Sequence, residues 1–164
     1  MGDASEPNKA TIIVFAGTLD KVMAAFILAT TMAAMGMQTT MFFTFWGLSV
    51  LKKKGARGSG ARNWMQKMLG WMLPDGPATL PLSQLNMGGM GASMLKKIMA
   101  QKKMSSLDEL IQTALELDVR MIACQTSMDA MGISREQLID AVEVAGAATY
   151  VGEARNAAIN LFIS

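Results

Sequence analysis

The chain has 164 residues, of which 51% are apolar, and a formal net charge of +2, a composition typical of one globular domain that excludes a disordered protein. It contains one cysteine, Cys124, and no histidine, so an internal disulfide, a cysteine-rich zinc site and a Cys-His catalytic pair are all excluded. A single free thiol indicates a reducing compartment such as the cytoplasm, and the polar residues 1–10 predict a flexible tail and not a secretory signal.

The domain begins with a predicted strand–helix–strand unit. Residues 11–16 are a continuous apolar run rich in β-branched side chains, which is typical of a central parallel strand. Thr18 or Asp20 is placed to cap a helix that begins near Lys21 and ends before a glycine at position 36. The aromatic and threonine-rich residues 39–45 predict the second strand of the unit.

A membrane span is the alternative interpretation of this region, because residues 22–51 carry no charge. The segment changes in composition, however, from helix-forming Ala, Met and Leu in residues 22–35 to β-forming aromatic residues after position 41. We therefore expect a helix and a buried strand that ends at Trp46 and Gly47, not one helix crossing a membrane.

Residues 55–104 predict a basic, methionine-rich insertion without a strand. The segment 52–103 contains ten Lys and Arg residues against one acid, Asp75, and helices are expected at 63–73 and 92–102. Such a surface is either solvated or a face for an anionic partner, a membrane surface or an acidic neighbouring subunit. The few aromatic residues and the lack of a nucleic-acid motif exclude RNA and DNA as partners, and the Gly-Gly-Met-Gly sequence lacks the Lys-Ser/Thr pair of a phosphate-binding loop.

The C-terminal part is predicted to alternate helices and strands. Ser106 begins a capping box and a helix, residues 119–123 form a strand ending at Cys124, and residues 125–131 form a turn or short helix. The remaining elements expected are a helix from the capping box at Ser134 through Val144, a strand over 146–151, and a helix from about Glu153.

These elements predict an α/β fold, a three-layer sandwich with a mostly parallel sheet of about five strands and helices on both faces. Right-handed crossovers place the carboxyl ends of parallel strands at one edge of the sheet. The residues expected at this edge are Thr18, Asp20, Trp46, Cys124 and Gly152.

Cys124 is the candidate functional residue, although a lone cysteine beside an apolar strand is often only a small core side chain. It lies at the end of its strand, where the backbone N–H groups that follow, from Gln125 onward, can face the sulfur, and Lys21 is expected at the same edge. Both features favour the thiolate. Without a general base, the chemistry indicated is that of a thiolate alone: accepting sulfur as a persulfide, thiol exchange or reversible oxidation, with no cofactor or metal.

The sequence resembles the DsrE/DsrF/DsrH-like sulfur-relay family, in its larger methionine-rich branch that is labelled peroxiredoxin-like or sulfurtransferase. The segments that carry the resemblance are Asp20-Lys21, Phe-Phe-Thr-Phe-Trp-Gly at 42–47, the glycine-rich 82–91, and Ala-Cys-Gln-Thr-Ser-Met-Asp-Ala-Met-Gly-Ile at 123–133. The resemblance implies a cytoplasmic homo-oligomer in which Cys124 carries persulfide sulfur, with TusA-like carriers and rhodanese-like donors as partners.

Three functional hypotheses follow. The first is a sulfur carrier or sulfurtransferase, with Cys124 supported by Thr18, Asp20, Lys21, Trp46 and Gln125. The second is a non-enzymatic oligomeric or membrane-surface docking module with a structural cysteine. The third, a thiol peroxidase, ranks last because only Arg120 or Arg155 is available to support the thiolate.

Overall fold

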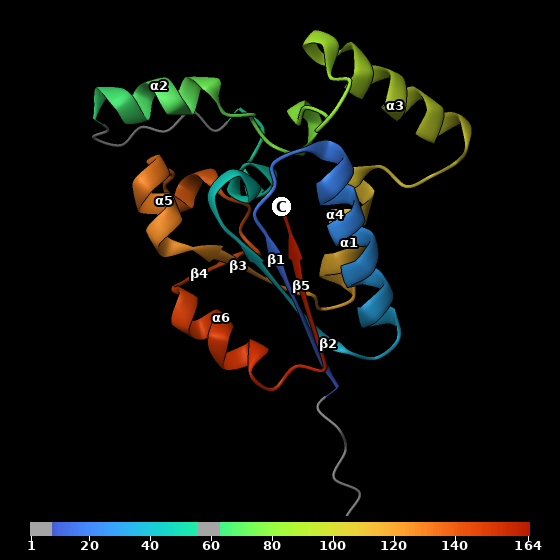
Figure 1. Ribbon diagram of the computed structural model, residues 1–164, viewed down its shortest axis with the longest axis vertical. Helices are drawn as coiled ribbons and strands as arrows, with labels where there is room; N and C mark the ends of the chain where they lie inside the picture. The colour runs from blue at the N-terminus through green and yellow to red at the C-terminus, as the bar shows by residue number, and fades with distance from the viewer. Residues whose placement is uncertain (1–7, 56–62) are drawn as a thin grey trace, which may run out of the picture.

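A five-stranded sheet forms the centre of the protein in the computed structural model, which describes residues 8–55 and 63–164 (Figure 1). The order of its strands is β4-β3-β2-β1-β5, and every adjacent pair is parallel. The strands are β1 (Lys9–Val14), β2 (Gln38–Phe43), β3 (Arg120–Cys124), β4 (Glu143–Ala145) and β5 (Ile159–Ile163). The predicted α/β class and the parallel five-stranded sheet are confirmed.

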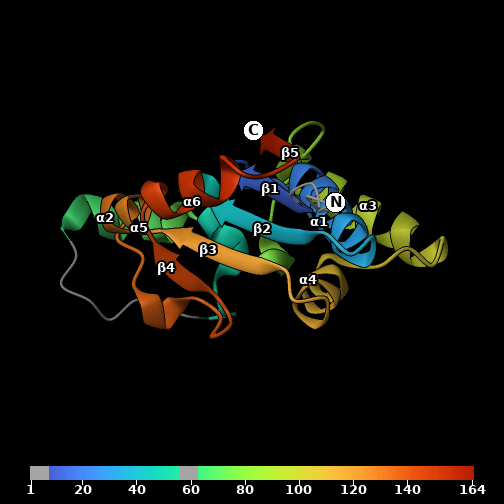
Figure 2. The same cartoon turned by 90° about the horizontal axis from the view of Figure 1, so that it is seen from below.

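Helices cover both faces of this sheet (Figure 2). The helices α1 (Leu19–Ala34) and α4 (Leu107–Glu116) pack on one face, and α6 (Ala147–Ala154) packs on the other. Alternate side chains of β1 enter the two layers: Ile12 belongs to the large core under α1 and α4, and Ile13 packs on the smaller cluster under α6. This period of two is a property of the pleated strand.

The first strand–helix–strand unit has the predicted order, with boundaries shifted by about two residues. Thr18 occupies the N-cap of α1, but its side chain makes no capping hydrogen bond. Gly36 follows the helix with a φ of +83°, the left-handed conformation expected at a helix C-terminus. Within the described parts of the chain, no helix combines the length and the hydropathy needed to cross a bilayer.

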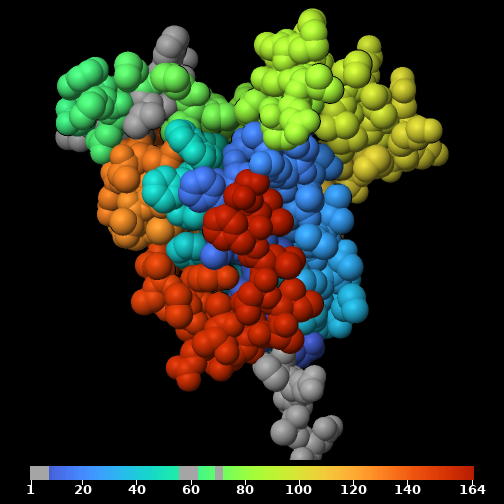
Figure 3. Space-filling view, in the orientation of Figure 1, coloured from blue at the N-terminus to red at the C-terminus, as the bar shows by residue number. Residues whose placement is uncertain are grey.

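The insertion contains the two expected helices, and no strand occurs among its described residues. Its elements, with the preceding turn η1, are η1 (Phe45–Leu51), α2 (Trp64–Met72), η2 (Pro77–Thr79), η3 (Met87–Gly89) and α3 (Met90–Gln101). In Figure 3, α2 and the segment with η3 and α3 form two lobes separated by a notch at the top of the molecule. The predicted N-terminal tail and the basic glycine-rich stretch of the insertion lie largely outside the described residues.

The elements after β3 correct part of the prediction. Helix α5 (Gln125–Met131) forms as expected and ends at Gly132, which has a φ of +65°. The helix predicted from Ser134 through Val144 is wrong, because only the short turn η4 (Arg135–Gln137) follows the capping box. The backbone of Ile139 instead donates to Leu51 O at 2.9 Å, beside an antiparallel bridge between Lys52 and Leu138. These long-range bonds are incompatible with a helix.

The two last predicted elements are exchanged in type. The strand predicted over 146–151 is the helix α6, and the helix predicted from Glu153 is replaced by the strand β5. The alternating burial of Ile159–Ile163 and its parallel pairing with β1 explain the second change. Gly152 therefore lies within α6 and not at the carboxyl edge of the sheet.

The carboxyl ends of the central strands are held together by two glycines. A Cβ atom on Gly47 would lie 2.1 Å from Val14 O, and one on Gly17 would lie 2.6 Å from Trp46 O. No larger residue fits at either position unless the backbone moves. The turn η1 thus packs directly on the end of β1 and shapes the edge of the sheet where the candidate residues lie.

Candidate functional site

Cys124 is the last residue of β3 and the N-cap residue of α5, as the sequence predicted for the strand end. Its side chain is 6% exposed and makes no capping hydrogen bond to the helix. The expected donation of N–H groups from the residues after Cys124 is thus not observed at the sulfur.

An apolar cluster covers the thiol on the α6 side of the sheet. Phe42, Ile122 and Cys124 share this face, and Tyr150 of α6 closes the cluster. The rings of Tyr150 and Phe42 lie 5.1 Å apart, and the Tyr150 hydroxyl is 3.2 Å from Thr11 Oγ1. Among the residues of this cluster, Tyr150 and Ala154 belong to α6, so we expect a movement of this short helix to increase access to the sulfur.

A pair of hydroxyl groups lies at the same level of the sheet as Cys124. Phe43 pairs with Ala123, so the next residue of each strand, Thr44 and Cys124, reach the same edge. Thr44 Oγ1 is 2.7 Å from Ser127 Oγ of α5. This bond joins the end of β2 to the helix that begins at the cysteine. Sequence reasoning missed it, and only the register of the parallel pair could have indicated it.

Lys21 does not lie beside Cys124. Its Nζ atom donates to Ser164 O at 2.6 Å, next to the end of β5. Two strands, β1 and β2, lie between β5 and β3, which makes three strand spacings, or roughly 14 Å. Helix α1 also packs on the face opposite to Cys124.

The other residues expected to support the thiol lie in three places. Asp20 accepts hydrogen bonds from the backbone N–H of Ser83, at 3.0 Å, and from the Ser83 hydroxyl. Partial burial raises the pKa of Asp20, but these hydrogen bonds outweigh it and hold the pKa below its ordinary value. Gln125 directly follows the cysteine and donates to Asp129 Oδ1 at 3.4 Å. Thr18, Lys21 and Trp46 line one cavity at the ends of β1 and β5.

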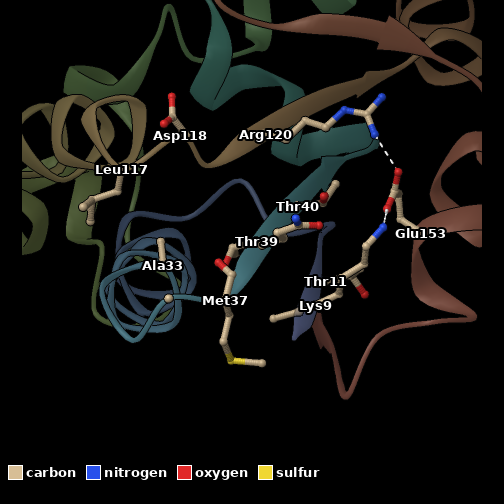
Figure 4. A pocket seen from close by; sticks show the side chains of 13 residues that line it. Lys9, Thr11, Ala33, Met37, Thr39, Thr40, Leu117, Asp118, Arg120 and Glu153 are labelled. Carbon is tan, nitrogen blue, oxygen red and sulfur yellow. Dashed lines mark hydrogen bonds and ion pairs between the residues drawn. The ribbon is translucent and has the colours of Figure 1, made fainter. Parts of the chain in front are cut away.

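A second cavity, of about 420 Å³, lies at the amino edge of the sheet and is lined by a network of ion pairs (Figure 4). Glu153 of α6 contacts both Lys9 and Arg120, each at 2.9 Å, and Arg120 also pairs with Glu143 at 2.8 Å. Arg120 is the first residue of β3 and Cys124 the last, so this guanidinium lies at the opposite end of the strand from the thiol.

These ion pairs shift the pKa values of their members. The hydrogen bond from Lys9 and the charges of Lys9 and Arg120 hold the pKa of Glu153 below its ordinary value, against a smaller opposing effect of burial. The hydrogen bond from Arg120 likewise lowers the pKa of Glu143, and it raises the pKa of Arg120. The network ties β1, β3, β4 and α6 together, which indicates a structural role.

Comparison with known proteins finds a matching family and two relatives that align with nearly the whole chain. Residues 6–162 match the sequence profile of the DsrE/DsrF/DrsH-like family. The chain is 37% identical over 158 residues to the uncharacterized protein YrkE of Bacillus subtilis, covering 96% of this chain and 98% of that protein. It is also 37% identical over 169 residues to the sulfur carrier protein DsrE2 of Allochromatium vinosum, covering 96% and 99%.

The fold has a counterpart of known structure. The crystal structure of the ychN protein of E. coli superposes with a TM-score of 0.53 at 14% identity, covering 94% of this chain and 99% of that chain. Identity this low bears on the fold and not on the chemistry of the site.

We predict that Tyr150→Ala increases the rate of Cys124 alkylation. Removing a buried aromatic ring costs about 3 kcal/mol or more, and each 1.4 kcal/mol taken from the cost of local opening is about tenfold in the open population. The rate should therefore rise by at least about tenfold in native buffer. The measurement is maleimide labelling followed by mass spectrometry, with the free energy of unfolding measured in parallel to separate local from global opening.

Val151→Ala is the matched control for this prediction, because Val151 lies on the same helix but is exposed. Its labelling rate should equal that of the unchanged protein. An unchanged rate in Tyr150→Ala would show that α6 does not control access to the sulfur.

We also predict that Glu153→Gln lowers the free energy of unfolding at neutral pH. The free energy of unfolding of this variant should also fall less steeply as the pH becomes acidic. The folded pKa of Glu153 lies below the ordinary value of 4.5, so its contribution is fully present above that pH and is lost as the pH falls through the folded pKa. For a pair at the protein surface we expect a loss of about 1 kcal/mol at pH 7.

The check for this pH dependence is urea denaturation of both proteins at several pH values. Their difference in unfolding free energy should shrink as the pH falls below the ordinary value of 4.5. Glu116→Gln, which removes a carboxylate outside the network, is the matched control variant. A difference in unfolding free energy that stays constant with pH would contradict the stabilising role given to the ionised carboxylate of Glu153.

Proposed function

The chain belongs to the DsrE/DsrF/DrsH-like family, and from this membership and the position of Cys124 we propose that it carries sulfane sulfur as a persulfide on Cys124 and passes it to a partner thiol. The observation that carries the proposal is the single thiol at the end of β3 in a chain without histidine that is 37% identical to a protein named as a sulfur carrier. A general role in sulfur relay, without the specific persulfide on Cys124, is supported by the family and by that relative together.

The proposed step needs only a thiolate. The Cys124 sulfur attacks the terminal sulfur of a donor persulfide, R–S–SH, forming a new S–S bond while the donor's own S–S bond breaks. The donor leaves as the thiolate R–S⁻, and Cys124 becomes Cys–S–SH. The same exchange with an acceptor thiol returns Cys124 to its starting state. No general base or added oxidant enters, which agrees with the lack of histidine in the sequence.

Burial of the thiol supports a carrier that is loaded by its partners. A persulfide left in water is open to other thiols, whereas the cluster of Phe42, Ile122 and Tyr150 shields the sulfur. We therefore propose that a docking partner displaces α6 to expose Cys124. TusA-like carriers and rhodanese-like donors are the proposed partners, in the cytoplasm. Whether the exchange is catalysed in the manner of a sulfurtransferase depends on those partners.

The residues proposed to support the thiol form two groups, one next to Cys124 and one farther away from it. Gln125 adjoins Cys124 in the chain and is proposed to contact the acceptor as α5 presents the sulfur. Thr18, Asp20, Lys21 and Trp46 lie around the end of β1. We propose that they act in partner docking at the carboxyl edge of the sheet, not in direct contact with the sulfur.

Assembly into a homo-oligomer is part of the proposal. Near the carboxyl ends of β1 and β5, aromatic side chains are exposed: Phe162 is 60% exposed and stacks on Phe15 at 6.2 Å, and Phe45 lies 5.4 Å from Phe15. A contiguous apolar patch of this kind is typical of a protein contact surface.

The methionine-rich helices favour a second candidate function, docking to an anionic membrane surface. Met90 and Met94 of α3, separated by one turn, are 65% and 64% exposed, and Lys97 is exposed on the same helix. A helix that presents flexible apolar side chains beside lysines suits an interface with acidic lipid headgroups.

We predict that incubation with inorganic polysulfide, or with thiosulfate and a rhodanese, adds the mass of one or more sulfur atoms to the protein. Cys124→Ser should abolish the adduct completely, because no other cysteine is present. A reductant should remove the added sulfur, and a cysteine-containing acceptor should take it up. The measurement is intact-protein mass spectrometry under non-reducing conditions.

Gln125→Ala, next to the cysteine, is the companion variant in this experiment and should still form the adduct while transferring it more slowly. The proposal fails if the Tyr150→Ala protein, in which the thiol is accessible, takes up no sulfur from any of these donors.

For the docking candidate we predict flotation with vesicles that contain phosphatidylserine, lost at high salt since screening weakens the attraction of exposed charges. Replacing both Met90 and Met94 by Asp should abolish flotation, and Cys124→Ala should leave it unchanged. Failure of the unchanged protein to float at low salt would remove this candidate while leaving the persulfide proposal intact.

A further inference from the structure

The cavity at the carboxyl ends of β1 and β5 is a second candidate site, separate from the thiol. Its volume is about 360 Å³, at the lower end of the range of small-molecule pockets. Its apolar walls come from the end of β1, from η1 and from the insertion. They include Phe15, Trp46, Leu73, Pro74 and Pro81. Cys124 does not line it and lies two strand spacings from β1, roughly 10 Å.

The topology of the sheet explains why a cavity forms here. From β1 the chain passes through α1 to β2 on one side, whereas β5, on the other side of β1, is reached through α6 on the opposite face. Helix α1 leaves β1 at the carboxyl edge, whereas α6 joins β5 at the amino edge. In open parallel sheets, ligands bind outside the carboxyl ends of the strands.

The walls of the cavity are held by fixed contacts. Lys52, whose side chain is 3% exposed, pairs with Asp75 at 3.1 Å and donates to Pro74 O at 3.3 Å. On the other side, Leu19 N donates to Pro81 O at 2.8 Å. The segment that closes the cavity is therefore anchored to η1 and to the start of α1, which preorganises the site.

Unsatisfied polar groups concentrate at this cavity. Among the described residues, the buried side-chain oxygens that lack a hydrogen-bond partner are Thr18 Oγ1 and Ser49 Oγ, and both residues line it. Ser49 is 1% exposed. Buried hydroxyls without partners are uncommon and costly, and each one calls for an explanation such as a bound molecule. Thr18 also forgoes the capping bond that its position at the start of α1 would allow.

Lys21 gives the cavity a positive charge. It lines the same space, and its ammonium group uses one donor on Ser164 O at 2.6 Å. An ammonium group has three donors, so two remain for a ligand. The cavity thus combines aromatic walls, two hydroxyls and one ammonium group, and no Asp or Glu side chain is among its lining residues.

From this arrangement we propose that the cavity binds a small aromatic carboxylate, with its ring between Phe15 and Trp46 and its carboxylate towards Lys21 and the hydroxyls of Thr18 and Ser49. The ring supplies apolar area for the walls, and the carboxylate accepts the hydrogen bonds that these groups leave unmade. This binding goes beyond the sulfur-relay proposal and does not depend on it.

The test is a titration of the full-length protein with 3-phenylpropionate, followed by amide chemical-shift changes in NMR spectra. Saturable shifts should centre on Gly17 and Trp46, and Cys124→Ser should bind equally well. Loss of a charge-assisted hydrogen bond should raise the dissociation constant about tenfold in Lys21→Met, with a smaller increase in Ser49→Ala. Lys97→Met, an exposed lysine outside the cavity, is the matched control and should bind like the unchanged protein.

Two analogues complete the test. The neutral 3-phenylpropanol and the ringless propionate should each bind at least about tenfold more weakly. Equal binding of the alcohol, shifts centred on the amino-edge cavity, or no saturable shifts at all would each overturn the proposal. None of these outcomes would alter the persulfide experiment, so the two proposals fail separately.

Discussion

The alternation of side chains along β3 is the constraint on which the site depends. Met121 and Ala123 point into the large core under α1 and α4, so Ile122 and Cys124 must point to the α6 side. A shift of one residue would place the thiol in the main core, where a large helix would cover it. Because the register of β3 is fixed by buried neighbours on both faces, Cys124 lies instead under the eight-residue helix α6.

The same alternation separates the thiol of Cys124 from the ammonium group of Lys21, which was predicted to lie beside it. All carboxyl ends of the parallel strands share one edge, which made proximity of Lys21 and Cys124 a reasonable expectation. An edge of five strands is about 19 Å wide, however, and has two faces. Cys124 lies towards one end of it on the α6 side, and Lys21 lies at the other end on the α1 side. The edge thus offers two regions of different chemistry.

Continuous apolar runs and glycine positions were sufficient to predict the first strand–helix–strand unit, the insertion helices and the strand that ends at Cys124. The errors fall between residues 134 and 163, where the elements are three to eight residues long. In such short segments, pairing with distant parts of the chain outweighs local preference: the bridge between Lys52 and Leu138 ends a predicted helix, and pairing with β1 makes Ile159–Ile163 a strand. The grouping of site residues required the strand order, which no local pattern contains.

A thin covering layer over Cys124 suits the proposed role as a sulfur carrier. The strand β4 has three residues at the edge of the sheet, and α6 has eight residues of which one, Tyr150, is buried. The ion pairs of Glu153 with Lys9 and Arg120 hold this layer at the amino edge, far from the sulfur. The covering helix is therefore anchored at one end and held near Cys124 mainly by the Tyr150 ring. We expect opening at that ring to expose the thiol while the large core, which lies on the other face, stays intact.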